Sequence, residues 1–492
     1  MADSELSRRR LLTASGGAAA AALVPTTPET TQATQATQAT PATPAIPAAP
    51  VAAAGPTLTR LGDTVLDQAA LYFVSYDGLV NVESFQLNGI MTHAGHQYAA
   101  WYTATRDVRI ARRTLPGGAW QAITLPHRLS VNDSHNVICL GISPADGRLH
   151  VAMDTHNSTI YYTKSDADLA AGGTWSAARF GPVQRSLDGV SLGAITYPQF
   201  VVAPSGRLQL FYRTGGSGNG TNELAEYTPS GWTKLGKWSS ATGSHTHNGA
   251  TSTTRNMYVH GLTYHGNRLH VAFTWREGNT AVLCNAGGLA NHDTCYVYSD
   301  DQGRTWRNGA GTQVGTTGGT LVSITSPGLI ADPLTVDHGL MNQESQAVDS
   351  TGRPHVIISY VPGRFTQCVS SYAAQRRTYG RVFHVRRDSA GAWHKRELPV
   401  PPNSTGRSRL VFDTADNAYV VLPFGRVAAA SAASGWTDWS LLFDAAGLNA
   451  FGEVTIDYPR ATTERILSIM YQQTSTAPTP SPLRVLDLRL GP

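Results

Sequence analysis

Two predicted β-hairpins each end in a pair of side chains that can bind a carboxylate or move a proton. In the second hairpin, a three-residue turn at 204–206 pairs Ala203 with Arg207, because its glycine can adopt the positive φ that such a turn needs. Counting outward places Tyr197 directly opposite Arg213. Opposed residues share one face of a sheet, with Cβ atoms about 4.5–5.5 Å apart. This hairpin is therefore expected to set a phenol beside a guanidinium.

The first hairpin contains a second pair with similar properties. A four-residue loop at 144–147 pairs Ser143 with Arg148, and the same outward count places His135 opposite His156. Both polar pairs lie at the end of their hairpin away from the turn, so hairpins on consecutive blades of one propeller would bring all four side chains to one mouth. A β-bulge in either hairpin would shift its pair by one residue, and the sequence leaves that open.

The four side chains suit one reaction. To break a glycosidic bond at O4 of a uronic acid by β-elimination, an enzyme must remove the C5 proton, protonate the departing O4 and neutralise the carboxylate. Arginine offers a charged, planar fork for the carboxylate, while histidine and tyrosine can exchange the protons. This chemistry needs no metal, nucleotide or covalent intermediate, so we expect no cofactor for catalysis. The alternative is that all four are ordinary polar residues at strand ends.

A recurring pattern indicates which elements would position these residues. A turn rich in Gly, Asp or Ser, then an apolar strand often led by Arg, recurs as ADGRLHVAMD (145–154), PSGRLQLFYR (204–213), HGNRLHVAFTW (265–275), STGRPHVIISY (350–360) and ADNAYVVLPF (415–424). Spacings of about sixty residues between the first three favour blades of four short strands. SDDQGRTW (299–306) resembles the Asp-box turn of sialidase-like propellers. We therefore predict an all-β, seven-bladed β-propeller over residues 57–492.

The N-terminal residues read as a targeting segment and a linker. Residues 1–25 combine three arginines with a short apolar run, which resembles a twin-arginine export signal. The alternative is a disordered basic tail beside an alanine-rich helix. Residues 26–56 form a Thr/Ala/Pro/Gln tract without core-forming residues and should be a disordered linker. We expect a secreted protein without a membrane anchor, since the run is too short to span a bilayer.

Composition restricts the partners. The chain has 38 Lys and Arg against 34 Asp and Glu, a net charge of +4, which is too slight an excess for a nucleic-acid binder. An acidic polysaccharide or oligosaccharide remains compatible with it. We expect the protein to act as a monomer.

Further polar residues are candidates for substrate binding. Two asparagines follow the histidines and a third follows a glycine-rich loop, and their alternative role is to cap turns; these are Asn136, Asn157 and Asn219. Others are expected to line the mouth on earlier or later blades, with blade packing as the alternative; these are His93, Gln97, Tyr98, Arg276, Asn342 and Gln343. Tyr212 should point away from Arg213 into the core.

The four cysteines leave alternatives open. Cys284 and Cys295 bracket a short loop and are expected to close it as a disulfide if the protein is exported. The alternatives are free thiols or a structural zinc or calcium site, for which the ligand candidates are Cys284, His292, Cys295 and His338. Cys139 lies inside an apolar strand and should be a buried thiol.

Several segments resemble the BNR-repeat carbohydrate-active propellers, a family that includes ulvan lyases and lyases releasing rhamnose from rhamnosyl-glucuronate termini. The resemblance rests on DSHNVICLGISPADGRLHVAMDTHNSTIYYTKS (133–165), ITYPQFVVAPSGRLQLFYRTGGSGNG (195–220), HDTCYVYSDDQGRTW (292–306) and GLMNQESQAVDSTGRPHV (339–356). It implies a seven-bladed propeller in which His135, His156, Tyr197 and Arg213 match the family's motif positions. The histidine and tyrosine would then act as acid and base, and the arginine would neutralise the uronate.

The sequence leaves three functions open. A lyase acting on a uronate is favoured by the paired motifs, and the resemblance implies glucuronate or iduronate linked to rhamnose as its substrate. A sialidase-like glycoside hydrolase would need an arginine cluster or a carboxylate pair at the mouth, and we expect no acidic residue beside the four. A non-catalytic sugar-binding propeller would not need His135 opposite His156. Which of His135 and Tyr197 is the base depends on the uronate epimer.

Overall fold

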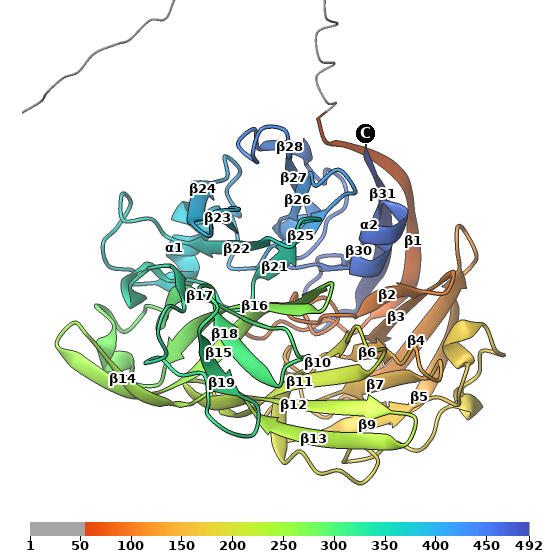
Figure 1. Ribbon diagram of the computed structural model, residues 1–492. Coiled ribbons are helices and arrows are strands. Elements are labelled where there is room, and N and C mark those ends of the chain that lie inside the picture. Colours follow the sequence, from red (N-terminus) through yellow and green to blue (C-terminus); the bar gives the residue numbers. More distant parts are fainter. Residues whose placement is uncertain (1–54, 492) are drawn as a thin grey trace, which may run out of the picture. The chain divides into compact units, whose positions relative to one another are not determined.

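The computed structural model describes residues 55–491. The predicted export signal at 1–25 and nearly all of the predicted linker at 26–56 lie outside the described residues. In the part of the chain that is described, no helix is long and apolar enough to cross a membrane. Almost every element between residues 55 and 491 is a β-strand (Figure 1).

Seven antiparallel sheets succeed one another along residues 55–491. The first sheet contains β2 (Ile90–His93), β3 (His96–Tyr102), β4 (Asp107–Thr114) and β5 (Gln121–Arg128). The second contains β6 (Cys139–Ile142), β7 (Leu149–Met153) and β9 (Tyr161–Lys164). The third contains β8 (Ser158–Thr159), β10 (Ala194–Val202), β11 (Leu208–Gly216), β12 (Asn219–Thr228) and β13 (Gly231–Lys237).

The next three sheets are also antiparallel and follow one another along the chain. The fourth contains β14 (Thr242–His247), β15 (Ala250–His265), β16 (Arg268–Glu277), β17 (Asn291–Ser299), β18 (Thr305–Asn308), β19 (Gln313–Thr316) and β20 (Ile330–Asp332). The fifth contains β21 (Ser345–Val348), β22 (Pro354–Tyr360), β23 (Arg381–Arg387) and β24 (Trp393–Glu397). The sixth contains β25 (Arg409–Phe412), β26 (Ala418–Val421), β27 (Val427–Ala430) and β28 (Ser440–Phe443).

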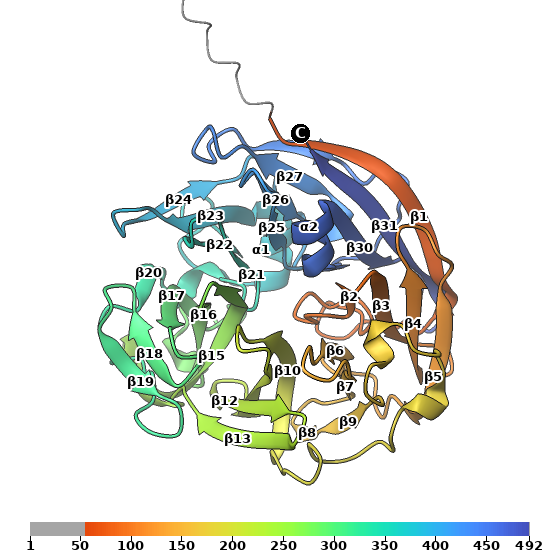
Figure 2. The same cartoon turned by 45° about the vertical axis from the view of Figure 1, so that its right-hand side comes forward.

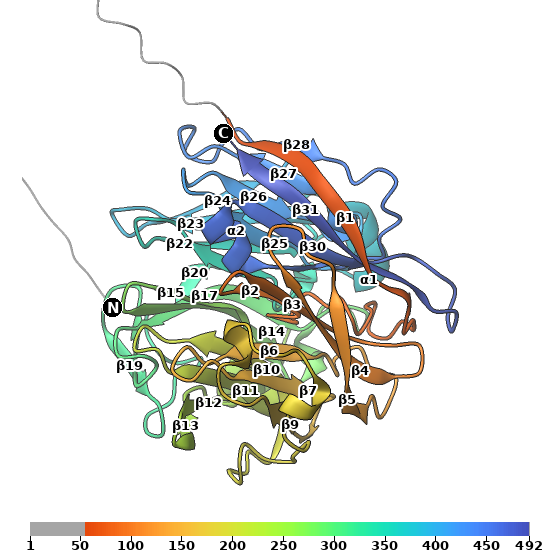
Figure 3. The ribbon, with the colours of Figure 1, turned by 90° about the vertical axis from the view of Figure 1, so that its right-hand side faces the viewer.

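The seventh sheet joins the two ends of the described chain. It contains β1 (Thr57–Ala70), β29 (Thr455–Ile456), β30 (Ile466–Gln472) and β31 (Ser481–Gly491), and β1 pairs antiparallel with β31 (Figure 3). Each sheet contacts the next one along the chain, and the seventh contacts the first, so the sheets form a closed ring (Figure 2). The predicted all-β propeller is therefore confirmed.

The few helices lie in connections between strands. They are α1 (Tyr372–Tyr379), α2 (Tyr458–Glu464) and the short 3-10 turns η1 (Leu169–Ala171), η2 (Ala177–Arg179), η3 (Thr280–Val282), η4 (Val336–His338) and η5 (Pro423–Gly425).

The repeated sequence pattern corresponds to one strand of five successive sheets. The apolar stretch after each predicted turn becomes β7, β11, β16, β22 or β26. All seven residues of β22 are buried, because sheets cover it on both faces and such strands read as continuous apolar runs. The Asp-box segment forms the turn between β17 and β18, where Asp301 Oδ1 accepts hydrogen bonds from the backbone of Arg304 and Thr305.

One disulfide joins Cys284 to Cys368, and the free cysteines Cys139 and Cys295 are both buried. The predicted Cys284–Cys295 pair is therefore wrong. Cys295 faces an apolar core from within β17, where it pairs with Phe273, while Cys284 lies in the loop after η3. The buried thiol predicted for Cys139 is confirmed.

Replacing both cysteines of this bridge, as Cys284→Ser with Cys368→Ser, should lower the free energy of unfolding by about 2–4 kcal/mol, because the bridge restricts the unfolded chain. Thermal unfolding with and without a reductant measures the loss. The double variant should not respond to the reductant. Peptide mapping of the unreduced wild type should yield linked fragments around 284 and 368, whereas a link between 284 and 295 would contradict the pairing.

Candidate active site

A polar cavity of about 320 Å³ opens where the predicted residues meet. Seven of the predicted side chains line it, namely His135, His156, Asn157, Tyr197, Arg213, Arg276 and Asn342. A second cavity, of about 420 Å³, holds none of the predicted residues and is lined mainly by apolar side chains such as Met91, Ile142 and Val202. Met91, Ile142 and Val202 lie next to the turns of the β2–β3, β6–β7 and β10–β11 hairpins. The polar cavity is at the other end of these hairpins, away from the turns, as expected.

The hairpin of β10 and β11 carries Tyr197 and Arg213 in a register that differs from the prediction by one residue. Near the turn the predicted pairing holds, since the Ala203 backbone N–H donates to Arg207 at 2.9 Å. A β-bulge between Thr196 and Gln199 then shifts the ladder, so that Arg213 pairs with Thr196 and not with Tyr197. Proline at 198 has no N–H to donate to the ladder, which favours a bulge at this point.

The bulge itself positions the tyrosine. Tyr197 adopts a left-handed backbone with φ 58°, a conformation that costs a bulky residue of order 1–3 kcal/mol and persists where the surroundings enforce it. Its ring consequently lies against the Arg213 guanidinium, whose Cζ is 4.9 Å from the ring centroid. The predicted meeting of phenol and guanidinium is therefore present, although the predicted direct opposition is wrong.

The hairpin of β6 and β7 keeps the predicted register over its paired length, from Cys139 opposite Ala152 to Ile142 opposite Leu149. The ladder ends before the histidines, so His135 and His156 lie in the segments that leave it. Their rings nevertheless stack with centroids 4.5 Å apart. The strand pairing alone therefore does not account for the meeting of the two imidazoles.

Asp133, a side chain outside the predicted set, binds both imidazoles at once. Its Oδ1 lies 2.9 Å from Nδ1 of His135 and its Oδ2 lies 2.6 Å from Nδ1 of His156. Burial alone would raise the pKa of Asp133, but hydrogen bonds from the two histidines hold it well below its usual range. The ionised carboxylate accepts an Nδ1–H from each ring, and on His135 this leaves Nε2 as the atom that can take up a proton. No described protein group hydrogen-bonds to either Nε2.

His135 is suited to act as a base near neutral pH. Burial lowers the pKa of His135 below its ordinary value, and the hydrogen bond to Asp133 offsets only part of that shift. The imidazole is therefore neutral at pH values where an ordinary histidine, with a pKa of about 6.5, begins to be protonated. Activity that depends on this base should persist below that pH and fall as the pH drops through the lowered pKa.

Replacing Asp133 with Asn should reduce kcat by roughly 10–100-fold, as loss of a carboxylate that orients an imidazole typically does. It also removes a group that raises the pKa of His135, so the acid limb of the kcat/KM profile should move to lower pH. The pH profile of the variant checks this. Asp388→Asn is the matched control, because Asp388 binds His394 at 2.6 Å but does not line the cavity. An unshifted acid limb in Asp133→Asn would contradict the positioning role.

Arg213 is a buried cation without a protein counter-ion. Its side chain is only 2% exposed, and it donates to Asn157 Oδ1 and Thr196 Oγ1, both at 3.2 Å, and to Tyr258 OH at 3.4 Å. None of the ion pairs recorded between described residues involves it, and its Nε has no hydrogen-bond partner. Buried charges are normally paired, so this guanidinium is arranged to receive an anion from the cavity.

Two phenols meet beside Arg213, and sequence reasoning found only one of them. Burial raises the pKa of Tyr197 above its ordinary value, which keeps this phenol protonated. Burial would also raise the pKa of Tyr258, but the charges of Arg213 and Arg276 hold it below its ordinary value. The two rings lie 6.0 Å apart, and the Tyr258 hydroxyl contacts Ser217 Oγ at 3.3 Å.

Another wall of the cavity carries a second, partly buried arginine, which has acidic partners. Arg407 Nη1 lies 2.9 Å from Glu453 Oε1 and 3.7 Å from Glu83 Oε2. Burial and the neighbouring Glu453 carboxylate raise the pKa of Glu83 well above its usual value. Burial would also raise the pKa of Glu453, but the Arg407 charge lowers it to about 2. Arg407 is thus neutralised by the protein, whereas Arg213 is not.

These carboxylates correct one expectation. No acidic residue was expected beside the four predicted side chains, yet Asp133 bonds to both histidines and Glu453 lines the same cavity. Asp133 is occupied by the imidazoles and Glu453 by Arg407.

Five predicted binding residues lie elsewhere. Tyr98 and Gln97 are buried near the turn of the β2–β3 hairpin, where their side chains bond to Ala170 O and to Asp457. His93 lies in the same hairpin, opposite His96 beside the turn, and so at the far end from the polar cavity. Asn136 donates to Asp154 inside the protein, and exposed Asn219 sits at the β11–β12 turn. Their positions in the fold, and not their residue types, place them outside the cavity.

Two further predictions on single residues are settled by packing. Gln343 is buried and lines a space of only about 20 Å³ behind Tyr197 and Arg213. Tyr212 points into the core as predicted, and its hydroxyl contacts Glu223.

The predicted metal ligands Cys284, His292, Cys295 and His338 are not brought together. Cys284 is bonded to Cys368 in the disulfide, Cys295 lies in the core, and Nδ1 of His338 contacts Val361 O. Among the described residues, metal-binding side chains come within reach of one another in two other groups, Asp133 with His135 and His156, and His245 with Glu277 and His292.

The cavity also includes residues that sequence reasoning missed, namely Tyr76, Asp77, Ser217, Tyr258, Leu289, Met341, Tyr372, Thr405, Gly406, Arg407 and Glu453. Most of them reach the cavity from connections between strands of distant sheets, and no local motif marks them. Asp133 had a usable signal, because a carboxylate two residues before a functional histidine can bond its ring.

The chain is similar in sequence to curated ulvan lyases. An ulvan lyase, long isoform, of Alteromonas sp is 24% identical over 455 residues, covering 82% of this chain and 43% of that protein. The long isoform from Pseudoalteromonas sp. (strain PLSV) is 23% identical over 463 residues, covering 82% and 43%. The chain thus spans less than half the length of these curated relatives.

Solved structures show the same fold. The polysaccharide lyase Uly1 superposes with a TM-score of 0.67 at 16% identity, covering 87% of this chain and 99% of that chain. A PL25 ulvan lyase bound to -[GlcA(1-4)Rha3S]- superposes with a TM-score of 0.59 at 13% identity, covering 87% and 95%. The family described as "BNR repeat-containing family member" matches residues 96–400. That match extends over more than half of the chain and includes both hairpins of the site. The protein therefore belongs to the BNR repeat-containing family.

Proposed function

We propose that the protein is a polysaccharide lyase that breaks the glycosidic bond at O4 of a uronic acid by β-elimination. The observation that carries this proposal is the buried Arg213 guanidinium, which faces the cavity without a protein counter-ion and lies beside proton-exchanging groups. A uronate carboxylate fits this guanidinium by charge and by its two-pronged geometry. The relatives named ulvan lyases support the same reaction class.

The reaction needs three coordinated events at adjacent atoms. The C5–H bond breaks, its electron pair forms the C4=C5 double bond, and the C4–O4 bond breaks with its pair going to O4. We assign removal of the C5 proton to Nε2 of His135, because Asp133 holds the Nδ1 proton and burial keeps the ring neutral. We assign protonation of O4 to Tyr197, because burial keeps its phenol protonated. Arg213 neutralises the carboxylate as charge moves onto it.

The remaining groups support these three. His156 shares the Asp133 carboxylate and stacks on His135, so it limits how that ring can turn. Tyr258 bonds to Arg213 and lies beside Tyr197, where it can return a proton to the acid after each turnover. The opposite assignment, with Tyr197 as base and His135 as acid, would apply to a uronate epimer that presents C5–H to the other side of the site.

The finer features of the proposal concern substrate, assembly and location. We propose glucuronate or iduronate linked to rhamnose as the cleaved unit, in line with the ligand named for one solved structure, -[GlcA(1-4)Rha3S]-. We also propose that each of the seven sheets serves as one blade. Export by a twin-arginine signal, a monomeric state without a membrane anchor, and catalysis without a cofactor complete the proposal.

Carboxyl reduction of the substrate tests the proposal. The protein is incubated with ulvan and with gum arabic, each in native form and after chemical reduction of its uronates to neutral sugars, and chain length is followed by size-exclusion chromatography. We expect cleavage of at least one native polymer and none of its reduced form, since reduction removes the group that Arg213 binds and that acidifies C5–H. Equal cleavage of both forms would contradict the proposal, and binding without cleavage would favour a sugar-binding propeller.

A further inference from the structure

A contact between distant parts of the ring lies beside the polar cavity. Asp77 lies in the connection from β1 to β2, between the seventh and first sheets, and Arg377 lies on α1 in the fifth sheet. Nη2 of Arg377 is 3.2 Å from Oδ1 of Asp77, with the side chains 52% and 33% exposed. Asp77 also lines the cavity. The two residues therefore form an ion pair at the cavity rim, which we call the crossing contact.

The Asp77 side of the crossing contact is fixed onto the catalytic histidines. Ser75 accepts a hydrogen bond from the Ser134 backbone at 2.7 Å, and Ser134 Oγ donates to Ser75 O at 2.8 Å. Tyr76, which is 68% exposed, packs nearly perpendicular to the His135 ring, with centroids 4.4 Å apart. This segment therefore covers part of the site from the solvent side.

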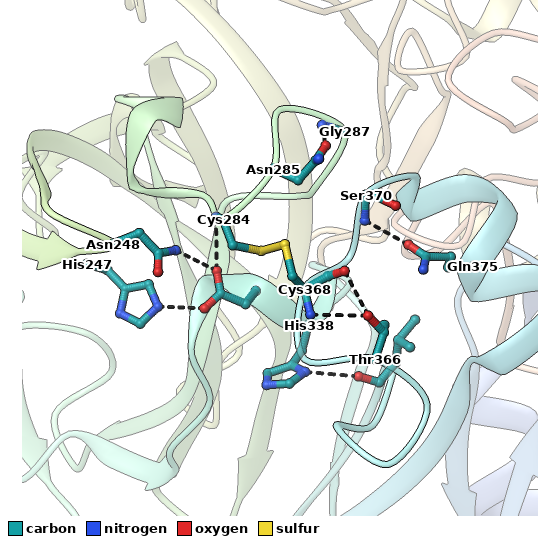
Figure 4. Close-up of a disulfide and its surroundings, with 12 residues drawn as sticks. His247, Asn248, Cys284, Asn285, Gly287, His338, Thr366, Cys368, Ser370 and Gln375 are labelled. Atoms are coloured by element: carbon teal, nitrogen blue, oxygen red, sulfur yellow. Dashed lines mark hydrogen bonds and ion pairs between the residues drawn. A yellow bond between two sulfur atoms is a disulfide. The ribbon is translucent and has the colours of Figure 1, made fainter.

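The α1 side is fixed by a buried arginine and by the disulfide. Arg376 donates to Ser359 O at 2.8 Å and holds α1 on the fifth sheet. The Cys284–Cys368 bridge ties the loop before α1 to the loop after η3 (Figure 4). The same two loops meet again where the Tyr372 backbone N–H donates to Gly287 O at 2.9 Å. Each side of this junction contributes one side chain to the cavity wall, Tyr372 at the start of α1 and Leu289 in the loop after η3.

The cavity is small, and residues from around the whole ring line it. Its volume of about 320 Å³ lies at the low end of the ~300–1,000 Å³ typical of ligand pockets. Its wall includes residues next to the second sheet (His135), the third (Arg213), the fourth (Arg276), the sixth (Arg407) and the seventh (Glu453). A polymer that continued past the site in both directions would need two gaps in this wall, and the crossing contact stands at the rim.

We propose that the crossing contact, held by the disulfide-linked loops, closes the mouth on one side, so that the site takes the end of a uronate-bearing chain and cuts there. This inference rests on the proposed lyase function. Asp77 and Arg377 are then the residues that determine chain-end specificity. Because both are partly exposed, the contact is weakened by salt and contributes little to folding.

The test follows two quantities during digestion of ulvan or gum arabic, whichever the wild type cleaves. Ultraviolet absorbance of the new double bond counts cleaved linkages, and viscosity reports the mean chain length. For the wild type we expect viscosity to fall slowly relative to the number of bonds cut. In Arg377→Gln the viscosity loss per bond should rise by roughly two- to fivefold, since an exposed ion pair shifts an equilibrium by at most about that factor. High salt should move the wild type in the same direction.

Arg364→Gln is the matched control. Arg364 is also 52% exposed, pairs with Glu397 at 2.6 Å and lies in the same connection between β22 and β23, but unlike Arg377 it does not pair with Asp77. It should behave like the wild type. A rapid early loss of viscosity in the wild type would overturn chain-end cutting, and an Arg377→Gln variant indistinguishable from Arg364→Gln would overturn the role of the crossing contact. Absence of absorbance with both polymers would instead count against the lyase function itself.

Discussion

Replacing Arg213 with Lys is expected to lower kcat/KM on a uronate polymer by about 10²-fold or more. Lysine keeps the positive charge but loses the planar fork, so it can neither grip both carboxylate oxygens nor follow the charge as it moves onto them. KM should rise as well, because the same contact holds the substrate before reaction. Steady-state kinetics on the purified variant measures both kcat/KM and KM.

The effect should be specific to the end of the hairpin that faces the cavity. Arg207 lies at the other end of the same hairpin and pairs with Glu226 at 2.9 Å, so Arg207→Lys is the matched control and should retain wild-type kinetics. Because Arg213 is nearly fully buried, thermal unfolding of the variant must be measured as well, to show that it is folded. A folded Arg213→Lys variant with unchanged kcat/KM would show that the substrate anion binds elsewhere.

Replacing Tyr197 with Phe is expected to reduce kcat by roughly 10²- to 10⁴-fold, the usual contribution of a general acid or base. The change removes only the phenolic hydroxyl, and the ring keeps its contacts with Arg213 and with Phe85. KM and thermal stability should therefore change little. His135→Ala should show a similar loss of turnover, because each of the two groups carries one of the two proton transfers that elimination needs.

Two further tyrosines serve as comparisons for Tyr197. Tyr212 lies one residue before Arg213 but points into the core, where its hydroxyl contacts Glu223, so Tyr212→Phe should retain turnover. Tyr258→Phe should reduce turnover less than Tyr197→Phe if Tyr258 only returns the proton. If Tyr197→Phe kept near-normal turnover while Tyr258→Phe lost it, the acid would be Tyr258, the phenol whose pKa two arginines lower.

Local patterns predicted the repeated strands and the two hairpins, because a glycine-containing turn fixes where pairing starts. They failed by one residue at Tyr197, since the bulge next to proline is a local departure from the regular pairing on which the residue count depends. The prediction that His135 and His156 meet was correct, but strand pairing is not the reason. His135 and His156 lie beyond the paired strands and are held by Asp133.

Contacts between distant sheets were beyond the reach of sequence spacing. The partner of Cys284 lies 84 residues away, on the loop before α1, whereas spacing alone favoured Cys295. The closing of the ring brings three distant residues to the cavity: Tyr258 from the fourth sheet, Arg407 from the connection before the sixth, and Glu453 from the connection after it. Nothing near them in the sequence marks that closure. His93 and Gln97 have suitable side chains, but their hairpin points them away from the cavity.

The central claim is elimination at a uronate, and the ratio of two products tests it most directly. During digestion of ulvan or gum arabic, new C4–C5 double bonds are counted by ultraviolet absorbance and new reducing ends by a chemical assay. Elimination predicts one double bond for every new reducing end, from the first minutes to completion, and loss of both signals in Tyr197→Phe. New reducing ends without double bonds would contradict the account and show that the cavity, with Glu453 in its wall, performs hydrolysis.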